Sequence, residues 1–201
     1  MTSAAEPSVA DRSDVRTIVG GGAKLGGVAV VGVVLFALLS RVISGSVEVI
    51  VQSVLVLLGG VVFAYVPAFW VRPRGVDGIG WTAMLGLMGA LFFTVVDTAV
   101  LRPLKLYHWT WDQIGGGSGF WYIPVWWMGS AFLAWLGGWV WARAGGANIA
   151  PRAGQTAGVG VVLFAIIVLT GILPFHAGTA ALAVTLGLIA TVPLTGSARG
   201  A

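Results

Sequence analysis

Six long apolar runs follow one another along this chain of 201 residues. An α-helix needs about 20 apolar residues to cross roughly 30 Å of hydrocarbon, so each run predicts one transmembrane helix. The runs lie at residues 25–43, 47–71, 77–101, 119–142, 157–175 and 178–195. A short Pro-Phe-His-Ala-Gly turn at 174–178 separates the last two, which together are too long for one crossing. The sequence therefore predicts an all-α, polytopic transmembrane helical bundle.

The composition supports a surface that faces lipid. Charged residues make up 9% of the chain and hydrophobic residues 58%, whereas about 25% of the residues in soluble domains are charged. The net charge of +4 would suggest nucleic acid in a soluble protein. Here the Lys and Arg residues stand at the ends of the apolar runs, so we expect no nucleic-acid partner. The chain has no Cys, which excludes thiolate catalysis and Cys-ligated metal sites.

The polar residues outside the runs predict the domain organisation and the orientation. Residues 1–17 are polar and of mixed charge, and we expect a disordered cytoplasmic tail followed by one transmembrane domain at 18–201. With the N-terminus inside, eight basic residues lie on the inner side: Arg12, Arg16, Lys24, Arg72, Arg74, Arg143, Arg152 and Arg199. Three lie on the outer side: Arg41, Arg102 and Lys105. Since Lys and Arg favour the cytoplasmic side, we predict a multi-pass cell-membrane protein with both termini inside.

Tryptophans concentrate near both predicted membrane boundaries. The inner group is Trp70, Trp81, Trp139 and Trp141, and the outer group is Trp109, Trp111, Trp121, Trp126 and Trp127. Indole is apolar with one hydrogen-bond donor, so it prefers the headgroup region. Anchoring at the interface explains most of these residues, and the density of the outer group also fits the lining of a pocket.

One face of the third run carries small residues and ends in a carboxylate. Gly86, Ala90, Thr94 and Asp97 follow one another at i, i+4, i+8 and i+11, so they share one helix face. Small residues allow helices to approach closely in membranes. We therefore expect this face to pack against a neighbour and to direct Asp97 into the bundle. The fourth run has a comparable series at Ala134, Gly138 and Ala142.

Asp97 is the strongest candidate for function. It precedes Arg102 by five residues, which places it in the outer leaflet. A carboxylate at membrane depth costs about 2.5–3.5 kcal/mol on insertion scales, so such residues usually face a protein interior or a cavity and serve a function. The structural alternative is an Asp97 that bonds to Thr94 or Thr98, or pairs with a basic residue. Glu48 and Gln52, four residues apart, predict a second polar face that is solvated at the interface.

The connection after the third run holds two more candidates. His108 and Asp112 are four residues apart, a spacing that suits a proton relay or half of a metal site. Zinc and copper sites need three or four ligands, and His176 is the one other histidine. We therefore predict no metal centre, and the sequence identifies no cofactor. The glycines around Ser118 break the helix and leave residues 104–114 to lie in the interface.

The residues that follow resemble a known family. The run contains Tyr107, His108, Trp109, Thr110, Asp112, Gly115, Gly116, Gly117 and the Ile-Pro-Val-Trp-Trp-Met segment at 123–128. It resembles the carotenoid-biosynthesis membrane proteins of the bacterioruberin hydratase type, which also place an acidic residue near the position of Asp97. The sequence at 102–106 differs from the Thr-Gly-x-Pro-Phe-Gly stretch of that family. The resemblance implies addition of water to a terminal double bond of an isoprenoid substrate.

Alkene hydration assigns roles to these residues. Burial favours the protonated form of a carboxyl group, so Asp97 is the expected acid, and His108 with Asp112 would orient the water. Aromatic faces stabilise cations, and the expected substrate-binding residues are Tyr107, Trp109, Trp111, Trp126 and Trp127. The substrate would be a membrane lipid or a hydrophobic isoprenoid that enters from the bilayer.

Two other functions remain open from the sequence. One is a non-catalytic small membrane subunit, or a pigment- or lipid-binding scaffold, that associates with other membrane subunits through its small-residue faces. The other is a transporter or channel, which has less support because the polar residues cluster on one side and do not line a path through the bilayer.

Overall fold

The computed structural model describes residues 13–106, 122–144 and 149–194, and within these ranges the chain forms helices and no strands. The elements are α1 (Val15–Val42), α2 (Ser46–Val71), α3 (Val76–Val96), the π-helix η1 (Asp97–Leu101), α4 (Tyr122–Ala144), α5 (Ile149–Leu169) and α6 (Ala177–Leu194). The predicted all-α bundle is confirmed.

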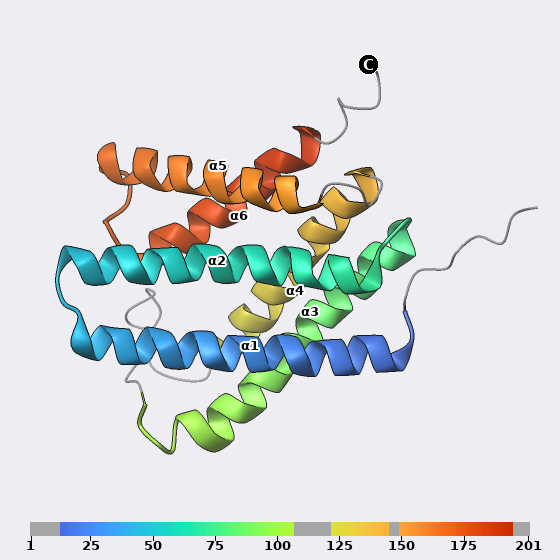
Figure 1. Ribbon diagram of the computed structural model, residues 1–201, viewed down its shortest axis with the longest axis horizontal. Coiled ribbons are helices and arrows are strands. Elements are labelled where there is room, and N and C mark those ends of the chain that lie inside the picture. Colours follow the sequence, from blue (N-terminus) through green and yellow to red (C-terminus); the bar gives the residue numbers. More distant parts are fainter. Residues whose placement is uncertain (1–12, 107–121, 145–148, 195–201) are drawn as a thin grey trace, which may run out of the picture.

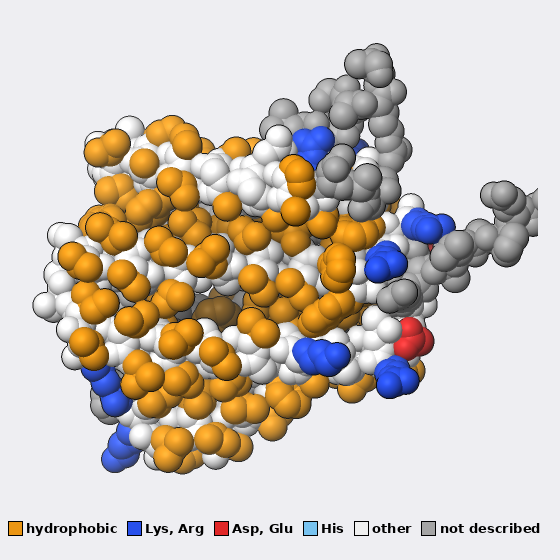
Figure 2. Space-filling model, viewed as in Figure 1, with side chains coloured by type: hydrophobic (Ala, Val, Ile, Leu, Met, Phe, Trp, Pro, Cys, Tyr) orange, Lys and Arg blue, Asp and Glu red, His pale blue; other side chains and the backbone are white. Residues whose placement is uncertain are grey.

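Length and hydropathy identify a multi-pass integral membrane protein. Five of the described segments are long and apolar enough to cross a membrane, and one of them joins α3 and η1 into the span Val76–Leu101. The sixth helix is also apolar but shorter than the other spans. Its 18 residues cover roughly 27 Å. Hydrophobic side chains cover the flank of the bundle, with Lys and Arg at its two ends (Figure 2). The same view shows a hollow with a hydrophobic floor between α1 and α2.

The helix ends differ from those predicted where polar residues extend a helix beyond its apolar run. The first helix starts at Val15, within the segment predicted to be disordered, because Asp14 caps it. The Asp14 carboxylate accepts hydrogen bonds from the Thr17 hydroxyl (2.7 Å) and amide (2.9 Å), which satisfies a free amide of the first turn. These bonds lower the pKa of Asp14, so the cap stabilises the helix at neutral pH and is lost as the pH falls through that pKa.

The fifth helix also starts before its predicted residue, but it ends before its predicted residue too. It begins at Ile149, whereas the sequence predicted residue 157, and it ends at Leu169 instead of residue 175. Gly171 follows with a positive φ of 71°, a conformation that glycine adopts without steric cost. The chain therefore turns earlier than its hydropathy indicates.

The helices are arranged in three pairs (Figure 1). Antiparallel α1 and α2 lie side by side at the front, and α3 and α4 cross behind them at an oblique angle. The remaining pair, α5 and α6, packs beside α2. The start of α1 and the end of α6 lie at the same end of the bundle. Which end faces the cytoplasm stays a prediction.

Small residues set the close approach of α3 to its neighbours. A Cβ atom on Gly86 would lie 2.5 Å from the Cβ atom of Ala134 in α4, and one on Gly26 in α1 would lie 2.7 Å from the carbonyl oxygen of Gly89. Both distances are too short for any side chain, so these glycines permit the two crossings. The prediction that the Gly86 face packs against a neighbour is confirmed, and that neighbour is α4.

A buried hydroxyl cluster joins α2, α5 and α6, and it supports a stability prediction. The Tyr65 hydroxyl lies 2.6 Å from Thr156 Oγ1, which lies 3.3 Å from Thr191 Oγ1. Replacing Thr156 with valine removes both contacts and leaves the Tyr65 hydroxyl buried, so we expect a loss of roughly 2 kcal/mol. Thermal unfolding in detergent measures it. Thr185→Val is the control, because the exposed Thr185 hydroxyl bonds only to its own helix. Equal melting temperatures for the two variants would contradict the prediction.

Candidate functional site

A π-helical turn at the end of α3 forms the centre of the site. The Arg102 amide donates to the Asp97 carbonyl oxygen at 2.9 Å, five residues back. In an α-helix, residue i+5 lies roughly 140° around the axis from residue i. The wider π turn brings the two side chains to the same side, and single π turns occur often at functional sites.

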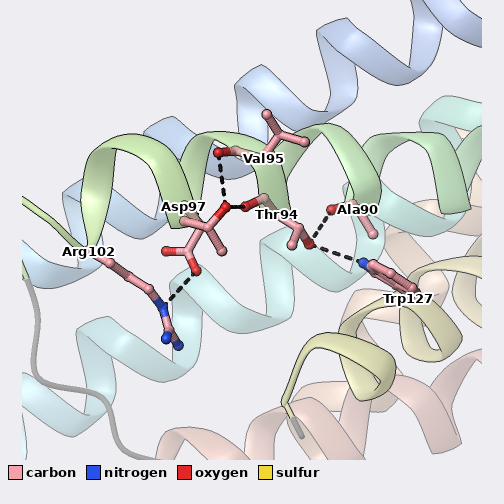
Figure 3. A network of polar contacts seen from close by, with 7 residues as sticks. Ala90, Thr94, Val95, Asp97, Arg102 and Trp127 are labelled. Carbon is pink, nitrogen blue, oxygen red and sulfur yellow. Dashed lines mark hydrogen bonds and ion pairs between the residues drawn. The ribbon is translucent and has the colours of Figure 1, made fainter. Parts of the chain in front are cut away.

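Asp97 is buried and forms an ion pair. Its side chain is 1% exposed, and its Oδ2 atom lies 3.3 Å from Arg102 Nε, whose side chain is 34% exposed. Burial of Asp97 inside the bundle agrees with the prediction from the helix face. The ion pair is the arrangement that the structural alternative predicted. The hydroxyls of Thr94 and Thr98 donate to backbone carbonyl oxygens of their own helix, at 2.8 Å each (Figure 3).

Trp127 joins α4 to the same face of α3. Its Nε1 atom donates to Thr94 Oγ1 at 3.1 Å, one turn before Asp97, and Figure 3 shows the indole next to Thr94. Trp126 is exposed, and its ring centroid lies 6.2 Å from that of Phe93. Two of the four tryptophans predicted to bind substrate, Trp126 and Trp127, therefore contact α3 near its polar end. Trp127 is held in place by a hydrogen bond, whereas Trp126 presents part of its ring to the surroundings.

A second polar cluster closes the same end of the bundle. Arg41 at the end of α1 donates to the carbonyl oxygen of Leu106 at 2.7 Å, which ties α1 to the segment after the π turn. Nearby, the Gln52 amide donates to Ser40 Oγ and to Glu48 Oε1, both at 2.8 Å. Gln52 is buried and Glu48 half-buried, so this face is part of the α1–α2 contact and is less solvated than predicted.

The remaining predicted site residues are not tested by the described structure. Five lie outside the described residues: Tyr107, His108, Trp109, Trp111 and Asp112. His176 is exposed, and its Nδ1 atom accepts a hydrogen bond from the Gly178 amide at 3.0 Å at the start of α6. Among the residues that the structure does describe, no group of three or more His, Cys, Asp or Glu is placed to hold a metal ion.

Arg102 is the site residue that sequence reasoning missed. We expected it to be a boundary charge, because it stands at the outer end of the third apolar run. Its distance of five residues from an aspartate is the signal that could have indicated a π turn.

The arrangement supplies a carboxylate shielded from solvent, a partly exposed guanidinium and an indole held against the same helix. Such a set can transfer a proton or bind a polar group at the end of an apolar chain. Comparison with protein-family models, curated proteins and solved structures gave no match for this chain.

Proposed function

We propose that this integral membrane protein binds an isoprenoid or a related lipid at the polar end of α3 and α4 and modifies it, with Asp97 as the acid–base group. The observation that carries the proposal is the buried Asp97 carboxylate at a π-helical turn. A carboxylate in a membrane-spanning segment is costly and usually functional. The resemblance of residues 107–128 to the bacterioruberin hydratase type supports the same substrate class.

The proposed reaction adds water to a terminal double bond. The carboxyl proton of Asp97 moves to the less substituted alkene carbon, and a cation forms at the tertiary carbon. A water oxygen then bonds to that carbon, and the extra proton of this water returns to the carboxylate. The faces of Trp126 and Trp127 would stabilise the cation. The net change is one water added to the lipid, with the enzyme returned to its first state.

Arg102 controls when the carboxyl group can act. In the structure its guanidinium contacts the Asp97 side chain, with Nε 3.3 Å from Oδ2. The acid step requires this contact to open, so that the carboxyl proton can reach the substrate.

The ion pair itself favours a second function. If Asp97 and Arg102 only fix the end of α3, the protein would be a non-catalytic membrane subunit or a pigment- or lipid-binding scaffold. Its polar cluster would then hold the bundle together, and partner subunits would bind elsewhere. In both functions, the bias of Lys and Arg supports a place in the cell membrane with the termini in the cytoplasm.

Asp97→Asn tests the catalytic proposal. The purified protein in lipid nanodiscs is incubated with a lipid extract rich in isoprenoid alkenes, and mass spectrometry follows the gain of one water. We expect the wild type to form a hydrated product and Asp97→Asn to form none, with a gel-filtration profile like that of the wild type. Asp77→Asn is the matched control, since Asp77 is exposed at the opposite end of α3. Full turnover by Asp97→Asn would refute the assignment, and no turnover by the wild type would favour the scaffold.

A further inference from the structure

A ridge of large side chains runs along the face of α4 that turns away from the bundle. Its members are Met128, Phe132, Trp135, Trp139 and Arg143, spaced four, three, four and four residues apart. Met128 is 72% exposed, Phe132 42% and Trp135 39%. The opposite face of α4, which includes Ala134 and Val140, is buried. We call this set the α4 ridge.

The rings of the α4 ridge contact one another in sequence. Phe132 and Trp135 are stacked, with centroids 6.0 Å apart and an angle of 19° between their planes. Trp135 and Trp139 follow with centroids 5.9 Å apart. The Arg143 guanidinium carbon lies 4.7 Å from the centroid of the Trp139 ring. The ridge is therefore a continuous apolar strip that ends in a cation.

The length of the ridge matches one lipid chain. Phe132 and Arg143 are eleven residues apart, or about 16 Å along the axis at a rise of 1.5 Å per residue. One leaflet contributes about 15 Å of the roughly 30 Å of hydrocarbon. With Arg143 at the headgroup level, the rings of Phe132, Trp135 and Trp139 extend from there to the middle of the membrane.

We propose that the α4 ridge binds an anionic phospholipid, with one acyl chain along the three rings and the phosphate at Arg143. A guanidinium forms paired, charge-assisted hydrogen bonds with phosphate oxygens. No carboxylate in residues 13–106, 122–144 and 149–194 forms an ion pair with Arg143, and its cation–π contact leaves its edge donors available. Stacked aromatic rings offer the acyl chain a rigid surface that loses little entropy on contact.

A lipid fits the ridge better than a second copy of this chain. Two copies with the same membrane orientation are related by a two-fold axis along the membrane normal, and the same surface of each faces the other. That arrangement would bring two Arg143 cations together. Helix pairs in membranes also favour small residues at their contact, and every member of the ridge is large. The inference does not depend on the role of Asp97.

Native mass spectrometry of the full-length protein tests the lipid site. The protein is reconstituted with equal amounts of phosphatidylglycerol and phosphatidylcholine, and the retained lipids are counted after the detergent is removed in the gas phase. We expect the wild type to retain phosphatidylglycerol preferentially. In Arg143→Gln the ratio of retained phosphatidylglycerol to phosphatidylcholine should fall about tenfold, the effect of one charge-assisted contact. Trp135→Ala should reduce retention of both lipids, because both carry acyl chains.

Two controls make the result decisive. Arg152→Gln removes a basic residue from α5 whose guanidinium bonds to Gln155, and it should leave the preference unchanged. Met128→Cys introduces the one thiol of the chain, and it should not cross-link to a second copy in the membrane. Equal preference in the wild type and Arg143→Gln, an equal loss in Arg152→Gln, or efficient cross-linking through Met128→Cys would each overturn the proposal.

Discussion

Gly137→Ala is expected to separate α4 from α2. Among Gly→Ala substitutions at the described glycines, we expect it to destabilise the protein most. A Cβ atom on Gly137 would overlap the backbone carbonyl oxygen and carbon of Ala64. Overpacking of a core usually costs about 1–3 kcal/mol when side chains can shift. A helix backbone moves only as a whole, so we expect a loss above about 3 kcal/mol. Thermal unfolding in detergent, followed by gel filtration, measures it.

Gly129→Ala is the matched control in the same helix. Nothing lies within 4 Å of a Cβ atom at Gly129, and the residue is exposed. Alanine in place of glycine stabilises an open helical position by roughly 0.5–1 kcal/mol, because the unfolded chain has less freedom to lose. The melting temperature should therefore fall for Gly137→Ala and hold or rise for Gly129→Ala. A shift of the same sign and size in both would show that the α2–α4 contact is not the one described.

The different surroundings of these two glycines show where sequence reasoning ends. Both lie in one apolar run, so hydropathy does not distinguish a glycine at a helix contact from an exposed one. The helices themselves were predictable, since the length and apolar character of each run follow from the thickness of the membrane. The ends of α1 and α5 were not, because their first turns are polar and depend on local contacts such as the Asp14 cap.

The candidate site was predictable as far as α-helical geometry applies. Gly86, Ala90 and Thr94 lie on one face of α3 and indicated that Asp97 points inward, as the structure shows. An ion pair of Asp97 was one of the predicted alternatives, but its partner Arg102 was not identified, because the contact depends on a π turn that the α-helical period does not include. Trp127 was identified from its aromatic neighbours, whereas its hydrogen bond to Thr94 depends on how α3 and α4 cross.

Arg102→Gln is expected to destabilise the protein more than Asp97→Asn, although both variants break the same ion pair. Removing one partner of a buried pair costs about 3–5 kcal/mol, because the other charge stays buried. The two partners differ in exposure, and this difference sets the order. Without Arg102 the Asp97 carboxylate stays inside the bundle, so we expect a loss near 3 kcal/mol, at the low end of that range because solvent reaches one side of the pair.

Without the Asp97 charge, Arg102 can extend its guanidinium to the polar interface, as long basic side chains do near helix ends. We therefore expect Asp97→Asn to cost less than about 1 kcal/mol, which agrees with its use as a folded but inactive variant. The double variant Asp97→Asn with Arg102→Gln should be more stable than Arg102→Gln alone. The single variant keeps the buried Asp97 carboxylate without the Arg102 guanidinium, whereas the double variant has neither group. Unfolding curves of the three variants give this order directly. If Asp97→Asn proves the least stable, contacts of the carboxylate other than the one with Arg102 contribute most to stability.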